Sequence, residues 1–190
     1  METTRSSEMP RLSVVIVPRN QIRRRVGELA AEITEAFGNR GLTIVGVLDG
    51  ALVFLADLIR RLPMRLELLT VGVRSYRGRD GTAGEIEFRH RLRTDLAGQH
   101  VLIVDDILDT GATLSAALEE TMSHEPASCR TCVLLRKKRG RGGSSLAGAV
   151  DFVGFDIPDV FVVGYGLDFD GRYRNLPDIV ALQQVGGQPR

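Results

Sequence analysis

Three carboxylates stand close together after a short apolar run. Asp105 and Asp106 follow the apolar residues 101–104, and Asp109 comes three positions later. An apolar run of this kind predicts a strand buried on both faces, and ligands bind at the carboxyl ends of such strands in open α/β sheets. Residues 109–113, with the sequence Asp-Thr-Gly-Ala-Thr, add backbone N–H groups, two hydroxyls and the start of a helix, which together suit a phosphate. The segment therefore predicts an acidic edge, formed by Asp105 and Asp106, beside a phosphate-binding turn over residues 109–113.

This combination favours a sugar phosphate over a nucleoside triphosphate or a dinucleotide. The chain contains neither a Gly-x-x-x-x-Gly-Lys-Ser/Thr loop nor a Gly-x-Gly-x-x-Gly turn after its first strand, which are the usual motifs for those ligands. Sugar hydroxyls can donate hydrogen bonds to carboxylates while the phosphate accepts from the amides. A structural alternative is an acidic helix cap, but capping requires one acid and not three.

At these residues the chain resembles the type I phosphoribosyltransferases, whose motif for phosphoribosyl pyrophosphate (PRPP) has this layout. The resemblance extends from about residue 14 to residue 180 and is strongest for the hypoxanthine-guanine branch. Further matches carry that distinction: Arg74-Ser75-Tyr76, Leu134-Leu135-Arg136-Lys137, and the segments 151–155 and 161–165 followed by Asp168.

The resemblance implies an enzyme of purine salvage. It would transfer the 5-phosphoribosyl group from PRPP to N9 of hypoxanthine or guanine, giving IMP or GMP and pyrophosphate, with Mg²⁺ as cofactor. Breaking the bond between C1 and pyrophosphate develops positive charge on the ribose and negative charge on the leaving group, so the site must stabilise both and exclude water.

The central motif receives most of the implied roles. Asp105 and Asp106 would accept the ribose hydroxyls, directly or through magnesium, and Asp109 would act as a general acid/base near purine N7. A plain turn-forming aspartate is the alternative for Asp109. The implied magnesium ligands are Asp105, Asp106 and Asp168, and the implied 5-phosphate residues are Asp109, Thr110, Gly111, Ala112 and Thr113.

Other segments would bind the purine and pyrophosphate. Lys137 resembles the lysine that donates to the purine 6-oxo group, and Phe161 resembles an aromatic residue that stacks on the base, although it could instead be ordinary core. The backbone near Val162 and Asp168 would meet the opposite edge of the purine. The implied pyrophosphate residues are Asp49, Gly50 and Arg174, and the implied lid residues are Ser75 and Tyr76, in a loop rich in glycine and polar residues.

Asp49 departs from the family pattern, which often has a basic residue at this turn. A carboxylate cannot attract pyrophosphate by its charge, so we expect binding through the amides of residues 49–51, and Asp49 could face a neighbouring subunit. The family often has a non-proline cis bond at this turn, and the sequence alone leaves open whether the Leu48–Asp49 bond is cis.

Alternating strands and helices predict an α/β fold with a doubly wound, mainly parallel sheet. Asn20 is the expected N-cap of a first helix that carries apolar residues from Ile22 to Phe37 at intervals of three and four. We expect a flexible tail over 1–12 and a single domain over 13–190. The late short strands would build a small hood lobe, mainly from about 137–190.

Composition says little more about the class of partner or the location of the protein. The chain has 190 residues, 43% of them hydrophobic, and its 25 basic and 24 acidic residues give a net charge of +1, so we expect neither nucleic acid nor membrane as the main partner. We expect a cytoplasmic protein, and the resemblance implies a homodimer or homotetramer. The basic residues 137–141 keep open a PRPP-sensing or nucleotide-binding regulator, and a relative preferring xanthine is a further alternative.

Cys129 and Cys132 have the C-x-x-C spacing of redox and zinc sites, but they lie in a predicted strand. An offset of three places two strand side chains on opposite faces, and the three histidines are widely separated in the sequence. We therefore expect structural thiols.

Overall fold

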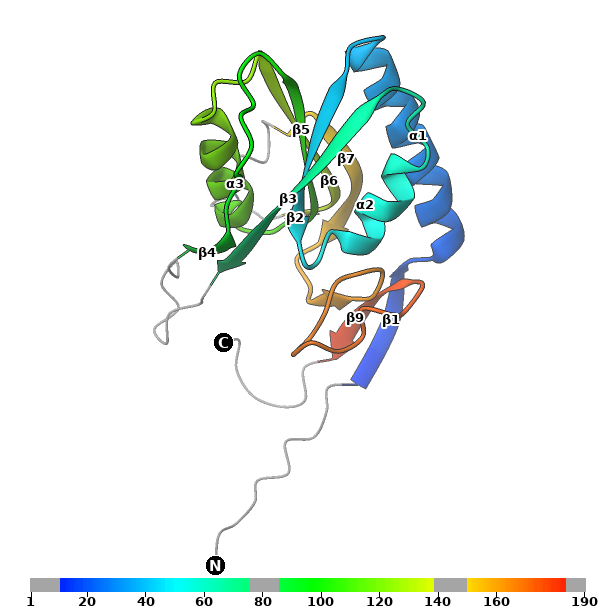
Figure 1. The fold of residues 1–190 in the computed structure, drawn as a ribbon. Coiled ribbons are helices and arrows are strands. Elements are labelled where there is room, and N and C mark those ends of the chain that lie inside the picture. Colours follow the sequence, from blue (N-terminus) through cyan, green and yellow to red (C-terminus); the bar gives the residue numbers. More distant parts are fainter. Residues whose placement is uncertain (1–10, 76–85, 139–149, 184–190) are drawn as a thin grey trace, which may run out of the picture.

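The larger sheet carries the candidate site. The computed structural model describes residues 11–75, 86–138 and 150–183. The strand order is β4-β3-β2-β5-β6-β7 (Figure 1), with β4 antiparallel at one edge and the others parallel. The bounds are β2 (Leu42–Leu48), β3 (Leu66–Ser75), β4 (Ile86–His90), β5 (His100–Leu108), β6 (Ser128–Lys138) and β7 (Phe152–Pro158).

Helices cover both faces of this sheet. In Figure 1, α1 (Arg19–Phe37) and α2 (Leu52–Ile59) lie on one face, and α3 (Ala112–Met122) lies on the other. Side chains of β5 alternate between two apolar cores: Leu102 packs with residues of α1 and α2, whereas Ile103 packs with Leu114 and Ala117 of α3. Residues 101–104 are fully buried, which confirms the prediction of a strand covered on both faces.

A second, three-stranded antiparallel sheet lies beside the larger one. Its order is β1-β9-β8, from β1 (Arg11–Val17), β9 (Ile179–Gln183) and β8 (Val162–Val163). Figure 1 shows the blue β1 next to the red β9, so an early segment completes the small lobe. Arg11 and Leu12 belong to β1, although the sequence placed both in a tail. Because β1 pairs with β9, 160 or more residues away in the chain, the local sequence could not show that these two residues belong to a strand.

One of the late strands, β7, joins the larger sheet and not the small lobe that the late strands were expected to build. This strand pairs in parallel with β6, with Val153 beside Val133, and a Cβ atom on Gly154 would lie only 2.3 Å from the carbonyl oxygen of Leu134. Short apolar runs do not reveal which of two sheets they join, because both have apolar inner faces.

The predicted N-cap of α1 was also wrong. The helix begins at Arg19 after Pro18, and the Asn20 side chain accepts a hydrogen bond from the amide of Gln21 instead. The carboxylate of Asp178 accepts from the Arg19 amide at 2.7 Å. Because Asp178 lies far away in the chain, local spacing could not identify it.

The two cysteines point to opposite faces of β6, as predicted. Cys129 packs against the core on the α3 face, and Cys132 is buried in the other core. Burial raises the pKa of Cys129 to about 11 and also raises that of Cys132, so both thiols are protonated at neutral pH. No helix in the described part of the chain is both long and apolar enough to cross a membrane.

The chain order creates a crevice between β2 and β5. From β2 the chain passes through α2 to β3 on one side, whereas β5 and the later strands lie on the other side. Such a reversal leaves an opening at the carboxyl ends of the two strands, where open α/β sheets bind ligands. Because Gly46 pairs with Val104, the turn after β2 and the acidic end of β5 meet at this opening.

Candidate active site

Asp105 and Asp106 occupy the carboxyl end of β5, as predicted. Only 4% of the surface of Asp105 is exposed, and one of its carboxylate oxygens accepts a hydrogen bond from the Asp106 amide at 2.9 Å. Burial, and then the charge of Asp106, hold the pKa of Asp105 well above its ordinary value. Burial also raises the pKa of Asp106, while the positive charge of Arg174 works in the opposite direction. The edge therefore holds two carboxylates that gain from a cation or from hydrogen-bond donors.

The turn after β5 leads directly into α3. Gly111 has a φ of 87°, a left-handed conformation that favours glycine, and its carbonyl oxygen accepts the Ser115 amide of the first helical turn at 2.8 Å. The Thr110 hydroxyl accepts from the Ala112 amide at 3.4 Å. Amides in the first turn of a helix lack partners within the helix, so this turn has the donors that an anion requires.

Sheet register brings Asp109 to Lys137. Leu108 pairs with Arg136, and the next residues of both strands therefore lie side by side. The Lys137 ammonium donates to the Asp109 carboxylate at 3.1 Å and lies 3.4 Å from the carboxylate of Asp159. Its side chain is 8% exposed. Asp159 was missed by the sequence reasoning, because it belongs to no recognised motif.

Phe161 is not a core residue. It is 39% exposed, and its ring stands edge-on to Phe169, with ring centroids 5.7 Å apart and planes at 84°. The alternative that placed it in the core is therefore wrong. Val162, by contrast, is buried in β8, so the chain presents the aromatic ring outward while its neighbour anchors the small sheet.

The turn after β2 touches the acidic edge. The Leu48–Asp49 peptide bond is cis. A Cβ atom on Gly50 would lie 1.8 Å from a carboxylate oxygen of Asp106, and one on Gly166 would lie 2.4 Å from the carbonyl oxygen of Gly50. Glycine at position 50 therefore lets the turn fit between Asp106 and the small lobe.

Asp49 has a cationic partner within the chain. Its carboxylate lies 3.1 Å from the guanidinium of Arg89 on β4, and both side chains are about half exposed, at 55% and 45%. The sequence reasoning missed Arg89 because 40 residues separate the two. The pair neutralises the carboxylate that the sequence analysis found unusual at this turn.

Asp168 and Arg174 form a second charged pair, in the loop after β8. The Arg174 guanidinium lies 2.8 Å from one oxygen of Asp168 and donates to the carbonyl oxygen of Gly166 at 2.6 Å. The other oxygen of Asp168 accepts from the Gly171 amide at 2.7 Å. No three His, Cys, Asp or Glu side chains among the described residues are grouped as a metal site. Asp105, Asp106 and Asp168 thus do not converge on one ion by themselves.

Of the two predicted lid residues, one lies outside the described residues. Ser75 is the last residue of β3, whereas Tyr76 lies outside the described residues. Residues 139–141 of the basic stretch also lie outside them.

Known proteins share this fold. A family model for the phosphoribosyl transferase domain matches residues 16–170, which places the chain in the phosphoribosyltransferase class. Hypoxanthine-guanine phosphoribosyltransferase of Bacillus subtilis is 41% identical over 169 residues, which are 89% of this chain and 92% of that protein. Hypoxanthine-guanine-xanthine phosphoribosyltransferase of Tritrichomonas foetus is 35% identical over 95% of this chain and 97% of its own.

Solved structures agree. The crystal structure of a hypoxanthine-guanine phosphoribosyltransferase from Bacillus anthracis matches with a TM-score of 0.82 and 32% identity, over 90% of this chain and 99% of that one. The chain belongs to the hypoxanthine-guanine phosphoribosyltransferase family.

Proposed function

We propose that this protein transfers the 5-phosphoribosyl group from PRPP to N9 of hypoxanthine or guanine, in purine salvage. The contact between Lys137 and Asp109 at 3.1 Å carries the proposal. It joins a donor suited to a 6-oxo group with an acid suited to proton transfer, directly after the carboxylate pair at the end of β5.

The acidic edge and the turn after it would hold the sugar. Asp105 and Asp106 accept the ribose hydroxyls, and the turn over residues 109–113 holds the 5-phosphate through amides and the hydroxyls of Thr110 and Thr113. Carboxylates near C1 also stabilise the positive charge that develops on the ribose as the bond to pyrophosphate breaks. Little covalent chemistry by the protein is needed.

The acidic edge fits magnesium. Its two carboxylates, of which Asp105 is buried and Asp106 partly buried, have raised pKa values, and magnesium is commonly held by one or two carboxylates together with substrate phosphates. Asp105 and Asp106 would hold it together with the sugar, and Asp168 would contribute on the pyrophosphate side. When bound, the ion neutralises charge that develops on the leaving pyrophosphate.

The purine would lie between Phe161 and the Lys137–Asp109 pair. Lys137 donates to the 6-oxo group, which disfavours adenine because its 6-amino group is itself a donor. Asp109 exchanges a proton with N7 while N9 attacks C1. Phe161, with its exposed ring, stacks on the base, and the backbone near Val162 and Asp168 meets the opposite edge.

The turn after β2 and Arg174 would hold pyrophosphate. Gly50 and its neighbours offer backbone amides, and Arg174 supplies a positive charge near Asp106. Asp49 acts with Arg89 as a neutral pair. Ser75 and Tyr76 would close over the reacting centre and exclude water.

A base panel tests the proposed function. Purified protein is incubated with PRPP, magnesium and one of hypoxanthine, guanine, xanthine or adenine, and the nucleoside monophosphate is measured. We expect IMP and GMP, with adenine inactive. Xanthine is included because one relative is named for it. Folded protein that yields no product from either hypoxanthine or guanine would reject the proposal.

We also propose a cytoplasmic homodimer or homotetramer built from one domain that begins with β1 at Arg11. Light scattering coupled to size-exclusion chromatography measures the number of chains in the particle. A monomer at micromolar concentration would reject this part and leave the proposed reaction untouched.

A further inference from the structure

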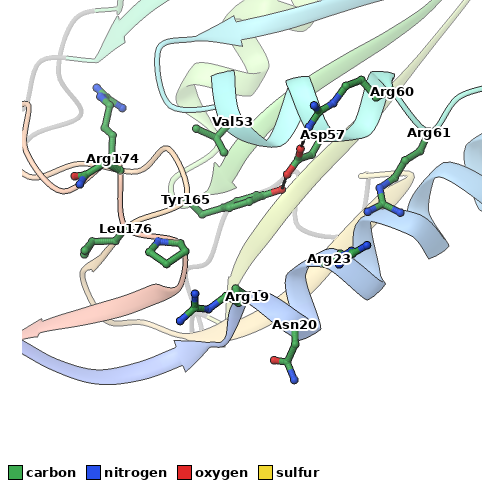
Figure 2. Close-up of a pocket in the computed structure, with 12 residues that line it drawn as sticks. Arg19, Asn20, Arg23, Val53, Asp57, Arg60, Arg61, Tyr165, Arg174 and Leu176 are labelled. Carbon is green, nitrogen blue, oxygen red and sulfur yellow. Dashed lines mark hydrogen bonds and ion pairs between the residues drawn. The ribbon is translucent and has the colours of Figure 1, made fainter.

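A hollow lies between α1, α2 and the loop after β8 (Figure 2), next to the candidate active site, with which it shares Arg174. Its volume is about 800 Å³, within the range of small-molecule sites, which is roughly 300–1,000 Å³. Its charged lining consists of five arginines and one carboxylate. These are Arg19, Arg23, Arg60, Arg61, Arg174 and Asp57. We refer to it as the arginine-lined cavity.

Two of the five arginines have no ionic partner among the residues that the structure describes. Arg60 is paired with Asp57, and Arg19 lies 3.7 Å from Asp178. Neither Arg23 nor Arg61 forms an ion pair with any residue in the described part of the chain. The cavity therefore has excess positive charge, which an anion would neutralise.

The two unpaired arginines approach from different helices. Figure 2 shows Arg23 on α1 and Arg61 just beyond α2, on the same side of the cavity. Arg61 reaches α1, since its guanidinium lies 3.3 Å from the position that a Cβ atom on Gly27 would take, one helical turn after Arg23. Guanidinium groups bind phosphate oxygens in pairs of parallel hydrogen bonds, so two of them suit a ligand with more than one phosphate.

Apart from Asn20 and Asn175, the rest of the wall is apolar or aromatic. Val53, Leu176 and Pro177 line the cavity together with Tyr165, whose hydroxyl donates to the Asp57 carboxylate at 2.7 Å. This bond fixes the ring and shields part of the only acidic charge in the lining. Such surfaces accommodate the organic part of a ligand.

We propose that the arginine-lined cavity binds a small organic polyphosphate, in which phosphates contact Arg23 and Arg61 and the organic part packs on Tyr165 and its apolar neighbours. Asp105, Asp109 and Lys137 do not line this cavity. The cavity shares Arg174 with the proposed pyrophosphate position, but its other arginines lie outside the positions proposed for the sugar and the purine.

Equilibrium binding of two probes, ATP and inorganic tripolyphosphate, tests the inference. The key variant is the double substitution R23S/R61S. The matched control is R24S/R93S, which removes the same charge from exposed arginines that do not line the cavity. Circular dichroism and transferase activity, which none of these four residues is expected to support, verify the fold of each variant.

We expect both probes to bind saturably, ATP more tightly because its nucleoside contacts the apolar wall. R23S/R61S should weaken both by about 10-fold or more, the scale expected for lost charge-assisted hydrogen bonds. R24S/R93S should change affinity by less than about twofold, because these solvent-exposed charges lie outside the lining and are screened by salt. Absence of saturable binding at millimolar concentration, or equal affinity of R23S/R61S and unmodified protein, would overturn the proposal. Equal affinity for the two probes would reject the proposed contact between the organic part of the ligand and the apolar wall.

Discussion

Two strand-to-helix turns meet at the crevice between β2 and β5, and they differ in how they can hold an anion. Each follows one of the neighbouring strands β2 and β5 and leads into a helix. The turn over residues 109–113 carries two hydroxyls and an acid that contacts Lys137. The turn over residues 48–51 has no hydroxyl, and its acid is paired with Arg89.

In the proposed reaction, this difference would separate a turn that acts through its side chains from one that acts through its backbone. Side chains of the turn after β5 would supply donors, a proton-transfer group and a neighbour for the purine. In the turn after β2, the close fit of Gly50 against Asp106 leaves room only for the main chain. Substitutions should therefore affect turnover at the first turn and PRPP binding at the second.

The largest expected effect is on turnover at Asp109. Asp109→Asn keeps the size of the side chain but removes its ability to accept and return a proton. We expect kcat to fall by roughly 10² or more, the scale for loss of a general acid/base, with PRPP binding retained. Steady-state kinetics and direct titration with PRPP measure the two quantities. An unchanged kcat would make Asp109 only a turn residue.

Gly50→Ala should act on PRPP binding. The added Cβ atom would lie 1.8 Å from Asp106, so either the turn or the carboxylate must move. Overpacking of this kind costs about 1–3 kcal/mol, and we expect KM for PRPP to rise by roughly 10-fold or more. Gly41→Ala is the matched control, because a Cβ atom there meets nothing within 4 Å. Similar kinetics for both variants would contradict the backbone role of the second turn.

These two turns also show how far sequence could lead. Asp105, Asp106 and residues 109–113 were predictable because strand, acids and turn are contiguous, so local pattern alone places them at the end of β5. The contact of Gly50 with Asp106 depends on the pairing of β2 with β5, and the partners Arg89, Asp159 and Asp178 come from distant segments. Local sequence does not encode contacts between distant segments, and the family resemblance assigns roles only to residues that match its motifs.

Lys137→Ala should affect the purine more than PRPP. The substitution removes the donor expected at the 6-oxo group and leaves Asp109 and Asp159 without the ammonium between them. We expect KM for hypoxanthine to rise by roughly 10-fold, the effect of losing a hydrogen bond to a charged group, with a smaller change in KM for PRPP. Initial rates with each substrate varied in turn measure both. The reverse order would mean that the purine binds elsewhere.

Asp105→Asn should stabilise the folded protein while lowering its transferase activity. Because the pKa of Asp105 is raised in the folded state, its contribution to stability is full below the unfolded pKa, about 3.9, and is lost as pH rises through the folded pKa. Asparagine keeps the acceptor for the Asp106 amide without the charge. We expect the free energy of unfolding to rise by about 0.5–2 kcal/mol near pH 7.

Urea unfolding in magnesium-free buffer measures this effect. The stability difference between Asp105→Asn and unmodified protein should shrink as pH is lowered from 7 towards 4. A difference that stays constant over this range would show that the charge of Asp105 is not its cause.

The smallest expected effects are at Asp49 and Arg89, and they should have opposite signs. Both side chains are about half exposed, and exposed ion pairs contribute only about 0–1 kcal/mol. Asp49→Ala leaves the Arg89 charge without its partner near the second turn, so KM for PRPP should fall by up to about threefold, within that energy range. Arg89→Ala leaves the carboxylate unneutralised, and KM should rise by a similar factor. Both changes should diminish in 0.5 M salt because exposed charges are screened. If Asp49→Ala instead raises KM, the carboxylate itself takes part in binding, and the second turn does not act through its backbone alone.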